Sequence, residues 1–307
     1  MNSILITGGS GFIGSNLTPL LLEKGHKVYI YDLKEPRNIE NLKGDIEYIK
    51  GDIRNQADIH KALSRVDKVV HLAADTRVMD SIANPVFNFE TNVLGTFNIL
   101  ESCRKHGIQN VAFASTGGAI LGEKDPPINE EMFPTPTSPY GASKLFAEGY
   151  LSAYAASYGI DFVALRFANV YGPLSYHKGS VVAHFIKQIL QDKPLTVYGD
   201  GSQLRDYIYV TDLCQGIVNG LEIKEPGVYQ LGTGKPTSIN EIISILKDVS
   251  GKEFEVNYED FRKGEIKNTY CNISKSKKYL NFSPEVDIKQ GIQNTWKWFG
   301  ENEKDAI

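Results

Sequence analysis

The sequence predicts an α/β protein with a doubly wound parallel sheet and a smaller, interleaved α/β cap. Two observations support this prediction. Short apolar strands alternate with helical segments through the first half of the chain, which is typical of a parallel sheet covered by helices on both faces. The first strand also leads directly into a glycine-rich turn that is followed by an apolar helix.

The glycine turn Thr7–Gly14 separates a first strand at Ile4–Ile6 from a helix at Ser15–Lys24. Glycines in such a turn let the backbone approach a pyrophosphate, whose charge the helix N-terminus stabilises. The next strand, Val28–Tyr31, leads into Asp32. A carboxylate at this position would accept hydrogen bonds from both ribose hydroxyls and would repel a 2′-phosphate. This order of elements therefore predicts a Rossmann unit that binds NAD rather than NADP.

Further strands are expected at Glu47–Lys50, Lys68–Leu72 and Val111–Ala114, with helices near Gln56–Ser64 and Val86–His106. In doubly wound sheets, ligands bind at the carboxyl ends of the strands. Small or polar residues follow these strand ends, at Asp52, Ala73-Ala74 and Ser115-Thr116. We therefore expect these residues to line one crevice.

A helix that begins near Pro139 carries a candidate acid/base pair. Proline is favoured in a first helical turn, where its missing N–H costs nothing. Tyr140 and Lys144 are four residues apart, so the phenol and the ammonium share one helix face. A nearby cation lowers the pKa of a phenol, which is about 10 in a free tyrosine. A lysine together with an oxidised nicotinamide ring would bring the pKa of Tyr140 towards neutrality.

The composition argues against several other classes of protein. The chain has 307 residues and a formal net charge of −4, so it shows no basic footprint for nucleic acid. It has no cationic leader segment and no apolar run of the roughly 20 residues that a membrane span needs. Cys103, Cys214 and Cys271 are far apart and show neither disulfide nor metal spacing. We expect a cytoplasmic protein without a metal, and we expect His71 to be a core residue or to lie behind the site.

The motifs occur in the order found in one family. They are the glycine turn, Asp32, Gly51-Asp52-Ile53, His71-Leu72-Ala73-Ala74, Asn92–Thr96, Ser115-Thr116, Tyr140–Lys144, Arg166–Pro173 and Arg205–Asp212. Together they resemble the extended short-chain dehydrogenase/reductases, and among these the nucleotide-sugar epimerase/dehydratase family. The resemblance extends from Ile4 to about Trp298.

This resemblance implies a set of contacts to an NAD cofactor. The implied residues are Gly8, Gly11, Phe12, Ile13, Gly14, Asp32, Asp52, Ile53, Leu72, Ala73, Ala74, Asn92, Ser115, Tyr140, Lys144 and Phe167.

The resemblance also implies the first step of a reaction. The Tyr140 phenolate would take the proton from the sugar O4 while C4 gives a hydride to NAD. Lys144 would lower the pKa of Tyr140 and bind the nicotinamide ribose. Thr116 is the first choice for a hydroxyl that hydrogen-bonds O4, and Ser115 is the alternative, because the following glycines leave the register open.

The stretch Gly117-Gly118-Ala119 distinguishes between reactions within this family. Dehydratases and decarboxylases carry a carboxylate there, because elimination or decarboxylation needs another acid or base. Without one, the 4-keto sugar can only be reduced again from its other face, which epimerises C4. The alternatives are an NAD-dependent oxidoreductase or dehydratase, and a dinucleotide-binding regulator without catalysis.

By resemblance to UDP-glucose 4-epimerases, the substrate is expected to be a UDP-hexose. Its implied contacts are Thr116, Tyr140, Asn169, Val182, Tyr198, Arg205, Arg262 and Thr269. Arg205, Arg262 and Asn169 would hold the diphosphate, since a guanidinium fork suits phosphate oxygens. Thr269 is small where some relatives have a bulky residue, so a 2-N-acetyl group should fit. Leu121, Gln230 and Asp75 depart from the usual residues, and Leu121 and Asp75 lie close to the expected sugar site.

The expected division of the chain is interleaved. Residues 1–172, with a returning segment at about 205–234, would form the NAD-binding domain, and residues 173–204 and 235–307 the nucleotide-sugar-binding domain. The helix from Tyr140 to Tyr158 is rich in alanine and tyrosine. Family members dimerise through this region, so the resemblance implies a homodimer.

Overall fold

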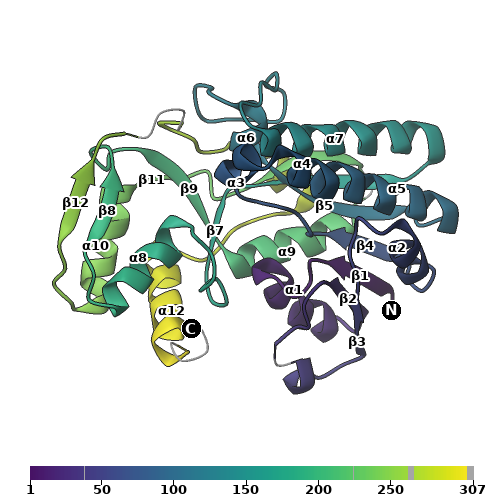
Figure 1. Ribbon diagram of the computed structural model, residues 1–307, viewed down its shortest axis with the longest axis horizontal. Helices are drawn as coiled ribbons and strands as arrows, with labels where there is room; N and C mark the ends of the chain where they lie inside the picture. The colour runs from purple at the N-terminus through teal and green to yellow at the C-terminus, as the bar shows by residue number, and fades with distance from the viewer. Residues whose placement is uncertain (38, 224, 262–265, 303–307) are drawn as a thin grey trace.

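The computed structural model describes residues 1–37, 39–223, 225–261 and 266–302, so Arg262 lies outside the described residues. A larger lobe holds the N-terminus and a wide sheet, and a smaller lobe packs beside it (Figure 1). In this described part, no helix is long and apolar enough to cross a membrane.

The larger lobe is built on a parallel sheet. Within the described residues it has seven strands in the order β10-β6-β5-β4-β1-β2-β3. The strands are β1 (Ser3–Thr7), β2 (Lys27–Asp32), β3 (Ile46–Lys50), β4 (Lys68–His71), β5 (Asn110–Thr116), β6 (Asp161–Phe167) and β10 (Gly227–Leu231). All of their pairings are parallel. The strand order reverses between β1 and β4, which is where doubly wound sheets bind ligands. The predicted fold class is therefore confirmed.

Alternate residues of β1 are buried on opposite faces of this sheet. Ile4 and Ile6 join a core that is covered by α1 (Phe12–Glu23) and α9 (Val210–Leu221). Leu5 joins the opposite core, beneath α2 (Gln56–Leu63), α5 (Gly95–His106) and α7 (Pro139–Tyr158). Strands buried on both faces read as continuous apolar runs, which explains why these runs were recognisable in the sequence.

The helical segment expected at 86–106 is divided into three parts. It consists of α4 (Pro85–Asn88), a π-helical stretch η2 (Phe89–Leu94) and α5. A shorter helix, α3 (Val78–Ala83), precedes it. The wider π-helical turn changes which side chains face inwards, and Asn92 within it is only 3% exposed. Such turns are frequent at functional sites.

Within the described residues, the smaller lobe contains two small sheets and three amphipathic helices. The sheets are β11-β9-β7 and β12-β8. Their strands are β7 (Asn169–Tyr171), β8 (Leu195–Tyr198), β9 (Leu204–Tyr209), β11 (Pro236–Ser238) and β12 (Val256–Glu259). The helices are α8 (Val181–Leu190), α10 (Ile239–Ser250) and α12 (Ile288–Glu301), which share one apolar core.

Further elements from the last third of the chain complete the larger lobe. β10 pairs with β6 at the edge of the large sheet, and α11 (Ser274–Leu280) packs against it. The chain therefore passes between the lobes more than once. The domain boundaries given above remain a prediction.

Candidate active site

The candidate site lies where β5 ends and α7 begins. Thr116 is the last residue of β5 and is followed by the short helix α6 (Gly117–Leu121). Ser138 caps α7, because its hydroxyl accepts a hydrogen bond from the Gly141 amide at 3.2 Å. A side chain at position 141 would overlap the carbonyl oxygen of Ala119, so glycine is needed there for α6 and α7 to approach each other. The N-terminus of α7 is thus held against the end of β5.

Tyr140 and Lys144 share one face of α7, as predicted. The Lys144 ammonium donates a hydrogen bond to the Ala114 carbonyl at 2.8 Å. It lies 4.6 Å from the ring centre of Phe113 and 5.9 Å from that of Tyr140. The lysine is 4% exposed. Its position therefore depends on both α7 and β5.

Burial acts against the charged forms of both side chains. It lowers the pKa of Lys144 to about 7, although the Glu148 carboxylate acts in the opposite direction. Burial also raises the pKa of the Tyr140 phenol, and the charge of Asp75 adds to this increase. Lys144 alone therefore does not produce the phenolate. A bound ligand with a positive charge near the phenol would have to supply the remaining stabilisation.

A buried ion pair fixes the strand end from which Thr116 projects. The Glu148 carboxylate accepts hydrogen bonds from Arg166 at 2.9 and 2.7 Å. It also accepts one from the Ser115 hydroxyl at 2.6 Å. These three side chains are between 3% and 6% exposed. Glu148 thereby connects α7, β5 and β6 directly beneath the site.

This network distinguishes between the two candidate hydroxyls. The Ser115 hydroxyl is occupied by Glu148, whereas Thr116 follows it at the tip of the strand. Successive residues of a strand point to opposite faces. The geometry therefore favours Thr116 as the hydroxyl that would meet a substrate.

A loop between β4 and α3 closes one side of the site. The Asn92 amide group bonds both backbone groups of Asp75, at 2.8 and 2.9 Å, and donates to the Ser143 hydroxyl at 3.1 Å. Asn88 donates to the Asp75 carboxylate at 3.1 Å. The Tyr140 amide donates to Ser81 in α3 at 3.2 Å. Asn92, a predicted cofactor contact, is thus engaged with the protein and holds this loop against α7.

The glycine turn fits a dinucleotide. Gly8 has φ +69°, and a Cβ there would lie 2.7 Å from the Ala73 amide nitrogen, so only glycine lets the turn and the end of β4 meet. Gly11 precedes α1, and among the described residues no side chain caps that helix. Its first amides are therefore suited to a pyrophosphate, with Gly14, Phe12 and Ile13 in or beside that first turn. Leu72 and Ala74 flank Ala73 on the facing segment.

Asp32 ends β2 beside this turn. Its carboxylate accepts hydrogen bonds from the amides of Ser10 and Lys34, both at 3.1 Å. These bonds fix the side chain where the sequence places the adenosine ribose. The position agrees with a role in binding NAD.

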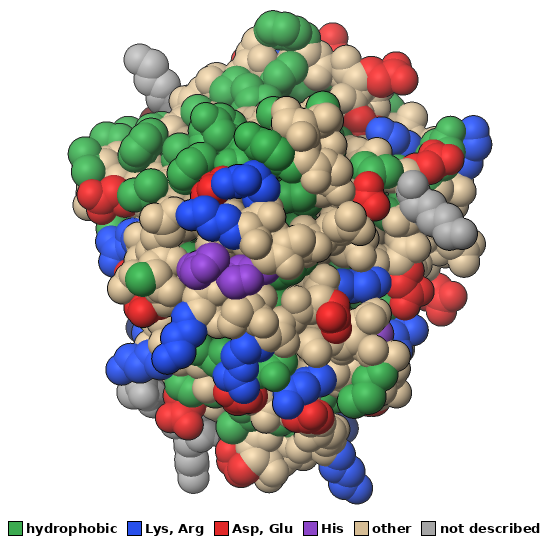
Figure 2. Space-filling model, turned by 90° about the vertical axis from the view of Figure 1, so that its right-hand side faces the viewer, with side chains coloured by type: hydrophobic (Ala, Val, Ile, Leu, Met, Phe, Trp, Pro, Cys, Tyr) green, Lys and Arg blue, Asp and Glu red, His purple; other side chains and the backbone are tan. Residues whose placement is uncertain are grey.

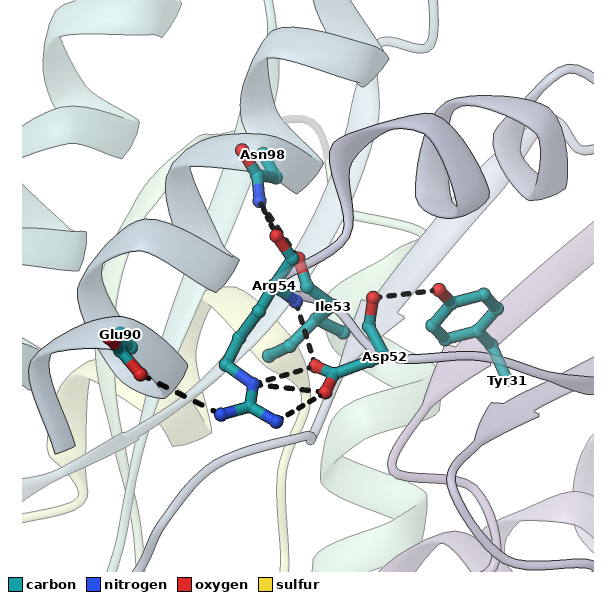
Figure 3. Close-up of polar contacts among 6 residues, drawn as sticks. All are labelled: Tyr31, Asp52, Ile53, Arg54, Glu90 and Asn98. Atoms are coloured by element: carbon teal, nitrogen blue, oxygen red, sulfur yellow. Dashed lines mark hydrogen bonds and ion pairs between the residues drawn. The ribbon is translucent and has the colours of Figure 1, made fainter. Parts of the chain in front are cut away.

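The segment after β3 forms a further polar cluster (Figure 3). Arg54 binds the Asp52 carboxylate through its backbone amide and its guanidinium, at 2.6 to 3.1 Å. These hydrogen bonds hold the pKa of Asp52 below its usual value. Asn98 on α5 holds the carbonyl groups of Ile53 and Arg54 at 3.0 and 3.1 Å. Asp52, a predicted cofactor contact, is therefore a carboxylate held in a fixed position after β3.

The predicted substrate residues divide into two groups. The Thr269 side chain faces Gly118, since a Cβ at Gly118 would lie 3.5 Å from the Thr269 hydroxyl. This places Thr269 next to the residue pair that follows Thr116. Phe167, a predicted cofactor contact at the end of β6, is the register partner of Thr116.

The second group lies on the smaller lobe. Asn169 donates to the Asp206 carbonyl at 3.1 Å, and Arg205 donates to the carbonyls of Ile266 and Lys267 at 2.6 and 2.8 Å. Tyr198 ends β8 in the same lobe. Val182 is 1% exposed and packs in that lobe's core, so its side chain is not open to solvent.

Sequence reasoning assigned no role to Glu148 or to the side chain of Arg166. A charged residue inside the apolar strand Asp161–Phe167 was the available signal, since such a residue needs a partner when buried. His71 is a core residue, as one of the two expected readings had it, and is bonded to the hydroxyls of Thr7 and Thr96 at 2.7 and 3.0 Å. Burial, and then the charge of Lys144, lower the pKa of His71 to about 3. Within the described ranges, no group of three or more metal-ligating side chains is gathered.

Comparison with known proteins gives one consistent result. The model of the NAD dependent epimerase/dehydratase family matches residues 4–232. A putative UDP-glucose 4-epimerase of Methanocaldococcus jannaschii is 39% identical, over 98% of this chain and 99% of that protein. A UDP-glucuronate 4-epimerase of Thermodesulfobacterium geofontis is 36% identical, over 98% and 97%. The solved structure of a UDP-N-acetylglucosamine 4-epimerase from Methanobrevibacter ruminantium superposes with a TM-score of 0.92 at 34% identity, covering 98% of this chain and 99% of that one.

The Glu148–Arg166 pair gives a first prediction, about stability. Glu148→Ala should lower the free energy of unfolding by about 3 to 5 kcal/mol, because it leaves the Arg166 charge buried without its partner. Glu47→Ala is the matched control, since the Glu47–Arg65 pair is 40% and 45% exposed. It should cost less than about 1 kcal/mol. Urea denaturation measures both values, and equal losses in the two variants would contradict this account.

The buried Lys144 gives a second prediction, about pH. In the folded protein Lys144 loses its proton near pH 7, whereas in the unfolded chain it keeps the proton up to its ordinary pKa of 10.5. The unfolded state therefore binds more protons between these values, so stability rises with pH in that window. Lys144→Met should remove this slope, which is at most about 1.4 kcal/mol per pH unit for one group. Denaturation of the nucleotide-free protein at pH 7, 8 and 9 measures it, and parallel curves for the two proteins would refute the assignment.

Proposed function

This chain belongs to the NAD-dependent epimerase/dehydratase family, and we propose that it interconverts the C4 epimers of a UDP-hexose with NAD as its cofactor. One observation carries the choice of reaction. Tyr140 and Lys144 lie at the start of α7 beside the end of β5, where Thr116 is followed by α6 with the sequence Gly-Gly-Ala-Ile-Leu. It offers no carboxylate for elimination. This arrangement therefore supports oxidation and re-reduction at one carbon, without loss of a group.

Each active-site residue has a separate role in this proposal. Bound NAD would accept a hydride from the sugar C4 and return it to the opposite face. The Tyr140 phenolate would take the O4 proton in the first half of the reaction and give it back in the second. Thr116 would hold O4 by a hydrogen bond, and the Lys144 ammonium would stabilise the phenolate. A positioned acid/base of this kind typically contributes about 10² to 10⁴-fold to the rate.

The preference for NAD follows from Asp32. Its carboxylate is fixed by two backbone amides at the end of β2. A 2′-phosphate would bring two like charges together at this point, whereas ribose hydroxyls would donate hydrogen bonds to it.

The size of the sugar pocket follows from Gly118 and Thr269. These two small residues face each other beside Thr116. The space they leave supports a substrate with either a 2-hydroxyl or a 2-N-acetyl group. We infer that both UDP-glucose and UDP-N-acetylglucosamine are accepted.

We further propose that two copies of the chain associate through α5 and α7. Phe146, Tyr150, Tyr154 and Tyr158 follow one another along α7, with ring centres 4.3 to 6.1 Å apart. Tyr150 and Tyr158 are 39% and 54% exposed. Figure 2 shows the side of the molecule that lies at the right of Figure 1, and hydrophobic side chains gather on the upper part of this side. An aromatic helix face that is left uncovered suits a self-complementary interface.

We infer a cytoplasmic enzyme from its cysteines. Cys103, Cys214 and Cys271 are free and buried, which fits a reducing compartment. Recovery of the enzyme mainly outside the cytoplasm on cell fractionation would contradict this inference.

The function is tested by incubating the protein with NAD and either UDP-glucose or UDP-N-acetylglucosamine, and following the products by proton NMR. We expect mixtures of C4 epimers with no net NADH. Tyr140→Phe should lower kcat by about 10² to 10⁴-fold, because it removes the proton acceptor. Thr269→Tyr should lose the N-acetylated substrate selectively, because it fills the space beside Gly118. Steady accumulation of NADH or of a keto sugar would overturn the proposal.

The proposed dimer is tested by sedimentation equilibrium at micromolar concentration. The wild-type chain should have twice the monomer mass of 34.1 kDa. Tyr150→Glu should dissociate it, because the substitution buries a charge in the interface. Tyr279→Glu is the matched control, since Tyr279 is also 39% exposed but lies on α11. A wild-type monomer would exclude this interface.

A further inference from the structure

A carboxylate lies in the loop that is tied to the first turns of the helix carrying the proposed catalytic tyrosine. Asp75 follows β4 at the carboxyl edge of the sheet, in the loop that Asn92 ties to the N-terminus of α7. Two further hydrogen bonds complete this tie, since Ser143 donates to the Tyr140 carbonyl at 2.8 Å and the Tyr140 amide donates to Ser81. The loop and the tyrosine therefore form one rigid unit.

The Asp75 side chain is held in place but its charge is not neutralised. Its backbone is fixed on both sides by Asn92, and its carboxylate accepts one hydrogen bond, from Asn88. Asn88 and Asn92 are 1% and 3% exposed, so both holding groups are themselves rigid. No lysine or arginine in the described part of the chain forms an ion pair with Asp75. The negative charge of Asp75 is also felt at the Tyr140 phenol, where it raises the pKa.

We propose that Asp75 restricts this enzyme to UDP-hexoses that are uncharged at C6, and that it excludes UDP-uronates. This inference rests on the proposed function, because it assumes that the sugar O4 meets Tyr140. The relatives named above are named for different sugars, one for UDP-glucose and one for UDP-glucuronate.

The proposed exclusion of UDP-uronates is electrostatic. In a hexose, C6 is joined to C5, which is the neighbour of C4, so a C6 carboxylate stays within a few ångströms of the atom that Tyr140 binds. It would therefore approach the Asp75 carboxylate in a partly enclosed site. At separations of about 6 to 10 Å and an effective dielectric constant of about 20, this repulsion corresponds to a roughly ten- to hundredfold loss in kcat/KM.

Three groups near Asp75, all among the described residues, offer no charge that would offset a C6 carboxylate. Gly117 and Gly118 provide no side-chain donor beside Thr116. The Lys144 ammonium is enclosed and bonded to Ala114. The Arg77 guanidinium, two residues beyond Asp75, is 71% exposed and pairs with Asp80 at 3.4 Å. A neutral CH₂OH group at C6 carries no charge, so Asp75 does not repel it.

The test compares kcat/KM for UDP-glucose and UDP-glucuronate at low ionic strength, with the NAD-loaded enzyme and its Asp75→Asn variant. Asparagine keeps the shape of Asp75 and can still accept the Asn88 hydrogen bond. The wild type should prefer UDP-glucose by at least about tenfold, and the variant should narrow this preference by about tenfold, chiefly through faster turnover of UDP-glucuronate. Asp80→Asn is the matched control, since it removes a nearby charge from the exposed side of α3, and it should leave the preference unchanged.

The outcomes separate this inference from the proposed function. Equal turnover of the two sugars by the wild type, or an unchanged preference in Asp75→Asn, overturns the role of Asp75 and leaves the epimerase proposal standing. If the wild type epimerises no UDP-hexose, the proposed function fails and this inference fails with it. If Asp80→Asn also narrows the preference for UDP-glucose over UDP-glucuronate, removal of any nearby negative charge has this effect. That result would also overturn the assignment to Asp75.

Discussion

The geometry of the site depends above all on the buried contact between Glu148 and Arg166. This pair joins α7 to β6, and through the Ser115 hydroxyl it also holds the end of β5. Ala114 and Thr116 flank Ser115, so the acceptor of the Lys144 ammonium and the proposed catalytic hydroxyl are fixed together. A buried ion pair contributes little net stability compared with apolar packing, but it has one well-defined arrangement. Here that arrangement places three elements of the site relative to one another.

The charges around the site are set by enclosure. Burial keeps the Tyr140 phenol protonated and weakens the hold of Lys144 on its proton. The charge of Asp75 disfavours the phenolate further, so in the cofactor-free protein Tyr140 keeps its proton and cannot act as a base. A positively charged ligand beside the phenol reverses this balance. In the proposed mechanism, proton abstraction by Tyr140 would therefore depend on cofactor binding.

Local patterns in the sequence predicted most of the fold. The strands were visible as apolar runs, and the glycine turn and the Tyr140–Lys144 spacing placed the two ends of the site. The π-helical stretch Phe89–Leu94 was not predictable, because the same residues suit an α-helix and only their tertiary contacts select the wider turn. Ser115 and Thr116 could not be separated either, since the choice depends on Glu148 and Arg166, which are distant in sequence. Glu148 was visible four residues after Lys144, but nothing local showed that it is buried.

In the proposed mechanism, C4 of the sugar is oxidised and then reduced again within one site. The most direct measurement is proton NMR of the epimerisation of UDP-glucose in D₂O. If the hydrogen of C4 leaves as a hydride and returns to the same carbon, both epimers should keep a proton at C4 even after many turnovers. Incorporation of deuterium from the solvent at C4 would show that the hydrogen is removed as a proton, and would contradict the account.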